Sequence, residues 1–292
     1  MNSNADKPNV AVLGLGLMGS GMARQLLNKG FSVTVFNRCR ARTLPFADAG
    51  AKVAATPRDA ASQAAVIISM LADDNASRAI WLGADGALDA VAPGTICIES
   101  STLTVGWVRE LCAATSARGA EFLDAPVTGS KAQAHAGELN FFVGGSESAL
   151  KKALPVFAAM AKNVTWVGPT GSGALLKLVN NFVCGVQVAA FAEALAVIER
   201  SGLDRAKSVE LLTNGAAGSP IVKTIAARAN ASDYTPNFLL RLMTKDLGYA
   251  IQEGAKASVE LATAAAALSE FQKAIAAGLG DKDMAALVER FR

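Results

Sequence analysis

Short apolar runs alternate with amphipathic segments through the first half of the chain. Several of the runs are rich in β-branched residues, which is typical of strands buried in a parallel sheet. They occupy 9–16, 32–38, 64–71, 95–100 and 120–127. The segments 19–29, 75–82, 104–118 and 148–160 fit intervening helices. This order predicts a mostly parallel sheet covered on both faces, with further strands at 140–145 and 164–168 near an edge.

The pattern changes in the second half, where strand signals almost disappear. From residue 174 onward the chain is rich in Ala and Leu at helical spacing. The first helix, about 173–201, would be ~42 Å long at 1.5 Å per residue and stops at Gly202. We therefore predict an α/β fold in which a doubly wound domain, residues 1–168, is joined by this long helix to an all-helical domain, residues 169–292, for substrate binding and oligomerisation.

Composition and charge exclude several classes of protein. Hydrophobic residues make up 51% and charged residues 18%, which excludes a disordered chain. A formal charge of +3 with 6% aromatic residues argues against nucleic-acid binding. The four cysteines are scattered without a CxxC pair, so we expect reduced thiols in a cytoplasmic protein, with no disulfide framework and no metal site. They are Cys39, Cys97, Cys112 and Cys184.

Neither the N-terminal segment nor the most hydrophobic segment favours a membrane protein. The N-terminal MNSNADKPN is polar and lacks the apolar stretch of a signal peptide. The most hydrophobic segment, 173–198, contains polar residues that are costly in lipid. These are Lys177, Asn180, Asn181, Gln187 and Glu193. We interpret the segment as a buried helix of a soluble protein, and the apolar, Ala-rich helices favour a homodimer or homotetramer.

A glycine-rich motif follows the first strand directly. Gly14, Gly16 and Gly19 form GLGLMG between the strand NVAVL and a helix, with Leu15, Leu17 and Met18 completing the loop. In such a strand–turn–helix context the first glycine permits a tight turn, the second lets a pyrophosphate approach, and the third allows close helix packing. A glycine-rich turn of an ordinary α/β protein is the alternative. The context favours a Rossmann-type dinucleotide-binding domain.

The end of the second strand indicates which dinucleotide binds. An NAD site usually places Asp or Glu there to bind the ribose hydroxyls. This chain has Asn37 and Arg38, with Arg40 and Arg42 close behind. Asn and Arg can bind the 2′-phosphate that a carboxylate would repel, so we expect NADP, with NAD possible. The alternative is that these arginines only solvate a loop.

Two residues are candidates for proton transfer. His135, the single histidine, lies in the segment KAQAHAGEL among small polar residues, and we expect it on the surface. Lys177 and Asn181 are four residues apart on the long helix and therefore share a face. A lone Lys would most often extend to solvent. The paired Asn181 and the position just after the domain boundary instead favour a polar site for Lys177.

Blocks spread over nearly the whole chain carry a resemblance to a known family. They are GLGLMGSGMARQLL (14–27), ESST (99–102), DAPVTGSKAQAHAGEL (124–139), GSGALLKLVNN (171–181) and KDLGYA (245–250). Together they resemble the β-hydroxyacid dehydrogenase family, which includes 3-hydroxyisobutyrate dehydrogenases, tartronate semialdehyde reductases and glyoxylate/succinic semialdehyde reductases. The chain departs from the family in three places. The proline of the family's STxxP segment is absent, and Ala72 replaces the proline of a frequent Leu-Pro pair. At residues 128–130, TGS replaces the common SGG.

The resemblance implies a role for each matching residue. Lys177 would be the general acid for reduction, and Asn181 would orient Lys177 or the substrate. Thr128, Gly129 and Ser130 would bind the substrate carboxylate through hydroxyl and backbone N–H groups. Leu71, Ala72 and Thr102 would lie along the cofactor, and Lys245, with Asp246 beside it, would close over the cofactor from the helical domain.

The resemblance also narrows the activity. The loop pattern GSKxxAxxGxL and the tail GLGDKDMAALVE (278–289) resemble the glyoxylate/succinic semialdehyde reductase branch. We expect NADPH-dependent interconversion of a small carboxylated aldehyde and its hydroxy acid. The first alternative is an NAD-dependent 3-hydroxyisobutyrate dehydrogenase or a tartronate semialdehyde reductase. An imine reductase, whose members generally lack the catalytic Lys, and a non-catalytic dinucleotide-binding module are further alternatives.

Overall fold

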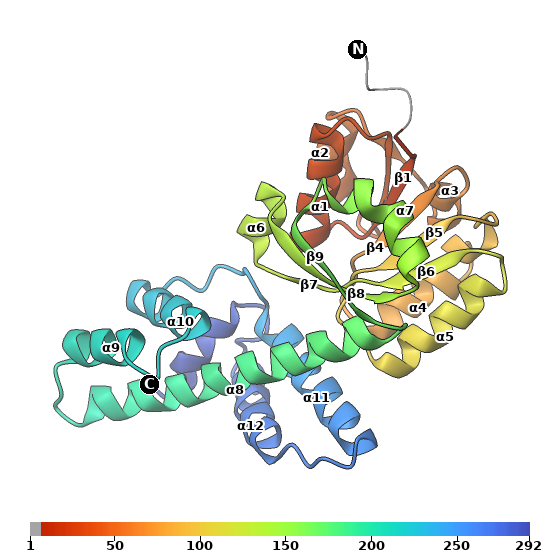
Figure 1. Cartoon of the computed structure of the whole chain (residues 1–292). Coiled ribbons are helices and arrows are strands. Elements are labelled where there is room, and N and C mark those ends of the chain that lie inside the picture. Colours follow the sequence, from red (N-terminus) through yellow and green to blue (C-terminus); the bar gives the residue numbers. More distant parts are fainter. Residues whose placement is uncertain (1–6) are drawn as a thin grey trace. The chain divides into compact units, whose positions relative to one another are not determined.

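The computed structural model describes residues 7–292 and divides into two compact units (Figure 1). The first unit ends at Lys177 and the second is Leu178–Arg292. The division falls inside helix α8, Ser172–Arg200, whereas the sequence places the boundary between residues 168 and 169. Most of the polar N-terminal segment, residues 1–6, lies outside the described range.

The first unit is built on one sheet with strand order β3-β2-β1-β4-β5-β6-β8-β7, and β9 pairs with β8. All pairings from β3 to β6 are parallel. β8 is antiparallel to β6 and β7 and parallel to β9. The strands are β1 Val10–Leu13, β2 Val33–Phe36, β3 Lys52–Val53, β4 Val66–Ser69, β5 Ile96–Glu99, β6 Glu121–Asp124, β7 Val127–Thr128, β8 Leu139–Gly145 and β9 Ala161–Gly168. The predicted mostly parallel sheet is confirmed.

Alternation along the central strands builds two separate cores. Val10 and Val12 of β1 face one apolar cluster, and Ala11 and Leu13 face the other. The first cluster includes residues of α1 (Leu17–Asn28), α6 (Lys131–Ala136) and α7 (Glu147–Phe157). The second includes residues of α3 (Pro57–Ala61), α4 (Asp74–Leu82) and α5 (Val105–Ser116). Helices therefore cover both faces, as the sequence predicts.

Several short elements escape the sequence prediction. They are β3, β7, α3, α6, α2 (Leu44–Ala47), and the 3-10 turns η1 (Arg40–Thr43) and η2 (Ala87–Asp89). Each spans two to six residues, which is too short for a hydrophobic period to show. One of them, α6, matters for function because it begins directly after the loop that is expected to bind substrate.

The second unit is helical around its own core. After α8 come α9 (Arg205–Asn214), α10 (Pro220–Ala231), α11 (Leu240–Lys256), α12 (Ala262–Ala276) and the 3-10 segment η3 (Met284–Arg290). Phe271, Met243 and Leu247 are fully buried in this core. Gly185 of α8 lets that helix approach α11, because a Cβ at this position would lie 3.0 Å from side-chain atoms of Met243 and Leu247. The predicted all-helical C-terminal region is confirmed.

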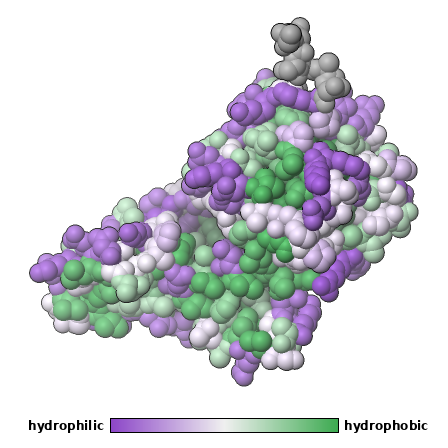
Figure 2. Space-filling view, in the orientation of Figure 1, coloured by the Kyte–Doolittle hydropathy of each residue, from purple (hydrophilic) through white to green (hydrophobic). Residues whose placement is uncertain are grey.

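Helix α8 is long and apolar enough to cross a membrane by length and composition alone. Half of its most apolar window is buried within the protein. Exposed apolar side chains, among them Val179, Val183 and Val197, give this helix an apolar surface (Figure 2). A core helix passes the same test of length and composition, so the finding is weak evidence for a membrane span.

Candidate functional site

The three motif glycines occupy three different environments. Gly14 has φ +101°, and a Cβ there would lie 2.4 Å from the Met70 carbonyl oxygen. A Cβ on Gly19 would lie 2.1 Å from the Gly14 carbonyl oxygen. A Cβ on Gly16 would meet nothing within 4 Å. Packing therefore requires Gly14 and Gly19, whereas open space lies beside Gly16.

The glycine loop ends at the N-terminus of α1, where no side chain caps the helix. Gly16 is the N-cap of α1 and provides no side-chain cap, and Leu17 and Met18 begin the helix. Leu15 is buried, so its side chain anchors the loop. Backbone N–H groups and the helix dipole at such a position attract a phosphate. The residues present thus fit the pyrophosphate of a dinucleotide.

Asn37 connects the end of β2 to the glycine loop. Its Oδ1 accepts a hydrogen bond from the Leu15 N–H at 2.9 Å, and its Nδ2 donates to the Cys39 carbonyl at 2.9 Å. Asn37 therefore shapes the loop and has only one donor hydrogen left for a ligand. Arg38, Arg40 and Arg42 are exposed around it, so recognition of a 2′-phosphate would depend mainly on guanidinium groups.

The segments after β4 and β5 are joined through a side chain. Leu71 and Ala72 follow β4 and are partly buried, as is Thr102 after β5. The Leu71 N–H donates to the Ser101 hydroxyl at 2.7 Å. This hydrogen bond therefore fixes the position of Leu71 relative to the segment that contains Thr102.

The loop expected to bind substrate is shaped by Gln133. Ser130 is the N-cap of α6, and its N–H and hydroxyl both donate to Gln133 Oε1. These two groups are already satisfied by a capping box. Thr128, partly buried in β7, and Gly129, exposed with φ +117°, are not part of the capping box. Thr128 and Gly129 therefore have more capacity than Ser130 to bind a substrate carboxylate, as the sequence predicts for this loop.

The helix that carries Lys177 is anchored at its start by Asp124. Asp124 Oδ1 accepts from the Gly171 N–H at 2.8 Å and Oδ2 from the Ala174 N–H at 2.9 Å. Burial raises the pKa of Asp124 to about 6, although the backbone hydrogen bonds act in the opposite direction. A Cβ on Gly173 would lie 2.7 Å from the Asp124 carbonyl oxygen, so the helix begins tightly against β6. Lys177 is partly buried less than two turns into this helix.

In the second unit a chain of polar side chains surrounds Asn181. Its Nδ2 donates to Asp246 Oδ2 at 2.6 Å, and its Oδ1 accepts from Asn180 Nδ2 at 3.0 Å. Lys245 Nζ lies 3.0 Å from Asp246 Oδ1 and 5.0 Å from the Tyr249 ring centroid. Asn181 and Asp246 are almost fully buried, at 2% and 1% exposure. The amide of Asn181 is therefore fixed in one orientation, on the helix face that also carries Lys177.

Three side chains that hold backbone N–H groups near the site were not predicted from the sequence. They are Gln133, which accepts from Ser130, Asp124, which accepts from Gly171, and Glu99, which accepts from Ser101. The Ser-x-x-Gln spacing of Ser130 and Gln133 is a capping-box signal that was available in the sequence. Nothing local marks Asp124, because its partners Gly171 and Ala174 lie 47 and 50 residues away. Glu99 binds the nearby Ser101, but its partners Ser77 and Trp81 lie 22 and 18 residues away. His135, the rejected proton carrier, is exposed in the last turn of α6.

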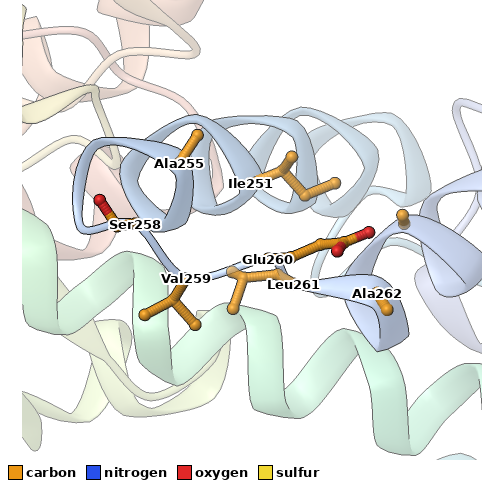
Figure 3. A pocket seen from close by; sticks show the side chains of 8 residues that line it. Ile251, Ala255, Ser258, Val259, Glu260, Leu261 and Ala262 are labelled. Atoms are coloured by element: carbon orange, nitrogen blue, oxygen red, sulfur yellow. The ribbon is translucent and has the colours of Figure 1, made fainter.

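One cavity in the second unit is lined by none of these residues. It encloses about 460 Å³ where α11 meets α12 and is lined by Ile251, Ala255, Ser258, Val259, Glu260, Leu261, Ala262 and Ala265 (Figure 3). Its lining is mostly aliphatic, with no cation to hold a phosphate or carboxylate. Within residues 7–292, no group of three or more His, Cys, Asp or Glu side chains gathers to hold a metal ion.

Comparison with known proteins accounts for both units. The family described as the NAD binding domain of 6-phosphogluconate dehydrogenase matches residues 9–168. The family described as NAD-binding of NADP-dependent 3-hydroxyisobutyrate dehydrogenase matches residues 171–291.

Similar whole proteins cover nearly the full chain. Glyoxylate/succinic semialdehyde reductase 1 of Arabidopsis thaliana is 33% identical, over 96% of this chain and 97% of its own. The NAD-dependent L-serine dehydrogenase of Pseudomonas aeruginosa is 37% identical, over 97% of both chains. A crystal structure of 3-hydroxyisobutyrate dehydrogenase from Salmonella typhimurium has a TM-score of 0.89 at 30% identity, covering 97% of this chain and 99% of the other.

Proposed function

The chain belongs to the β-hydroxyacid dehydrogenase family, and from that premise we propose that it reduces short aldehydes carrying a carboxylate, with NADPH as the reductant. Succinic semialdehyde and glyoxylate represent the proposed substrate class. The observation that carries the proposal is the polar set on one stretch of α8, in which Lys177 lies one helical turn before the fixed amide of Asn181.

Lys177 is the proposed general acid. When bound, the reduced dinucleotide supplies a hydride to the carbonyl carbon, and negative charge develops on the carbonyl oxygen. The Lys177 ammonium donates a proton to that oxygen, and in the reverse direction the amine accepts it. Asn181, whose amide is held by Asp246 and Asn180, keeps a polar group at a fixed position one turn away.

The substrate loop supports a carboxylate ligand. The Thr128 hydroxyl and the Gly129 N–H are short donors, and together such donors replace the hydration of a carboxylate. Ser130 contributes less to carboxylate binding than its sequence position suggests, because its N–H and its hydroxyl both donate to Gln133. An uncharged aldehyde of equal length should therefore have a much lower kcat/KM than the carboxylated one.

The preference for NADPH rests on Asn37 and the exposed arginines that follow it. No carboxylate follows β2 until Asp48. We expect NADP(H) to bind about tenfold better than NAD(H), or ~1.4 kcal/mol. Arg38→Ala should weaken NADPH binding and leave NADH binding unchanged. Arg118→Ala, which changes an exposed arginine paired with Asp89, is the matched control and should change neither. Equal affinities of the unmodified protein for both cofactors would refute the preference.

A substrate panel tests the activity as a whole. It contains glyoxylate, succinic semialdehyde, tartronate semialdehyde, 3-hydroxyisobutyrate and L-serine, each assayed with both cofactors. The best kcat/KM is expected for glyoxylate or succinic semialdehyde with NADPH. NAD-dependent oxidation of a 3-hydroxy acid is the second candidate, because a relative of 37% identity is named an NAD-dependent L-serine dehydrogenase. If that oxidation is faster, the substrate assignment is wrong.

A further inference from the structure

A buried carboxylate lies beneath the two segments that follow β4 and β5. Glu99, the last residue of β5, has no exposed surface. Its Oε1 accepts from the N–H of Ser101 at 3.0 Å and from the Ser101 hydroxyl. Its Oε2 accepts from the Ser77 hydroxyl at 2.6 Å and from Trp81 Nε1 at 3.0 Å. Four donors thus converge on one side chain.

This arrangement requires a carboxylate. The backbone N–H of Ser101 and the indole N–H of Trp81 can only donate. A carboxylate offers acceptor sites on both oxygens, whereas the amide of a glutamine would turn an NH₂ group toward one of these donor pairs. Each hydrogen bond to a charged acceptor is also stronger than a neutral one, which offsets the cost of burying Glu99.

The hydroxyl of Ser101 links Glu99 to the segment that follows β4. It accepts the Leu71 N–H at 2.7 Å while it donates its own proton to Glu99. A continuous hydrogen-bonded path therefore runs from Leu71, after β4, through Ser101 to Glu99 on β5. Ser77, on the other oxygen of Glu99, belongs to α4 and has no contact of this kind with Leu71.

We infer that Glu99 is a positioning residue of the dinucleotide site, acting through Ser101 on the backbone of Leu71. The inference rests on the proposed function, in which Leu71 and Thr102 lie along the cofactor. Thr102 directly follows Ser101, so the hydrogen bonds of Ser101 with Glu99 and Leu71, here called the Glu99 clamp, set the position of the segments after β4 and β5. A shift of the clamp would misplace the bound dinucleotide relative to the substrate and slow hydride transfer.

Two buried serines provide a matched test. Ser101→Ala and Ser77→Ala each remove one hydroxyl that donates to Glu99, but only Ser101→Ala breaks the link to Leu71. Both variants are characterised by thermal unfolding, by NADPH binding through fluorescence, and by turnover with NADPH or NADPH deuterated at the transferred position. If either alanine variant folds poorly, Ser101→Cys and Ser77→Cys give the same comparison, because a thiol has nearly the same shape and bonds weakly.

The expected results separate positioning from simple stability. Both variants should lose similar amounts of thermal stability. Ser101→Ala should lose about tenfold in kcat, with a larger deuterium isotope effect, because a misplaced hydride makes the chemical step slower. Ser77→Ala should stay within about twofold of the unmodified enzyme. Equal kcat values and isotope effects in the two variants would overturn the inference.

The same experiment distinguishes the inference from the proposed function. If the unmodified protein neither binds NADPH nor turns over any aldehyde in the panel, the proposed function fails. If the unmodified protein is active and the two serine variants behave alike, only the role of Glu99 fails.

Discussion

The two units of this protein present their candidate functional groups in different ways. In the first unit the groups are mostly backbone: the glycine loop, the N-terminus of α1, the Leu71 N–H and the Gly129 N–H. In the second unit they are side chains, linked from Asn180 through Asn181 and Asp246 to Lys245. Any residue can supply a backbone N–H, so the first set of groups depends on how the surrounding packing shapes the chain. The second set depends on which side chains are present, because their functional atoms differ from residue to residue.

Buried carboxylates serve the two units in correspondingly different ways. Glu99 and Asp124 accept hydrogen bonds from backbone N–H groups of Ser101, Gly171 and Ala174, and so they fix the path of the chain. Asp246 accepts from the side chain of Asn181 and pairs with the Lys245 ammonium. Substitutions of Glu99 and Asp124 should therefore act through the path of the backbone, and substitution of Asp246 through charge and hydrogen bonding.

Lys177 gives the largest expected effect and the sharpest test of side-chain chemistry. Lys177→Ala should lower kcat by about 10² to 10⁴, because the proton donor is removed. Lys177→Arg is the control, since it keeps a positive charge that cannot be deprotonated in the protein. Steady-state kinetics on folded variants should show both to be slow. Near-normal turnover of the arginine variant would mean that charge, and not proton transfer, is the contribution of Lys177.

Asp246 tests whether the second unit depends on paired side chains. Asp246→Ala should cost about 3–5 kcal/mol of unfolding free energy, because the Asn181 amide and the Lys245 ammonium lose a buried acceptor. Asp246→Asn should cost less, because an amide oxygen can still accept from Asn181. Urea denaturation monitored by circular dichroism measures both. The comparison between the units breaks down if the alanine variant is as stable as the original protein.

The same substitution should affect stability at one glycine of the first unit and cofactor binding at another. Gly19→Ala should cost about 1–3 kcal/mol of stability, because its Cβ overlaps the Gly14 carbonyl. Gly16→Ala should leave stability within about 0.5 kcal/mol, since its Cβ enters open space and its backbone is extended. Gly16→Ala should nevertheless weaken NADPH binding by about tenfold, or ~1.4 kcal/mol. Thermal unfolding and fluorescence titration distinguish these effects, and full NADPH affinity in Gly16→Ala would place the pyrophosphate elsewhere.

Asp124 tests a different quantity, the dependence of stability on pH. Its pKa is raised from 3.8 to about 6 by burial in the folded protein. Between these values the folded state holds the proton more tightly than the unfolded state, so this residue lowers stability as pH rises from about 4 to about 6. Asp124→Asn should remove this component, on the order of 1–3 kcal/mol. Chemical denaturation at several pH values checks it, and parallel curves for the two proteins would contradict it.

The sequence predicted the elements whose patterns are long. The strands β1, β2, β4, β5 and β6 follow from apolar runs of six to eight residues. The long helix α8 and the all-helical second half follow from Ala and Leu at helical spacing. The expected range 173–201 differs by one residue at each end from Ser172–Arg200. Elements such as β7 and α6 were not predicted, because two to six residues carry no readable period. Homo-oligomerisation, cytoplasmic location and the role of each site residue stay predictions.

By itself, the sequence determined the features that depend on local spacing. The three glycines of GLGLMG lie next to one another along the chain, and Lys177 and Asn181 share a helix face because four residues make about one turn. Only the tertiary structure decided which atoms these groups contact. Glu99 with Ser77, Asp124 with Gly171, and Asn181 with Asp246 are 22, 47 and 65 residues apart. Folding brings such partners together, because a buried carboxylate must find donors wherever the packing of the sheet and helices places them.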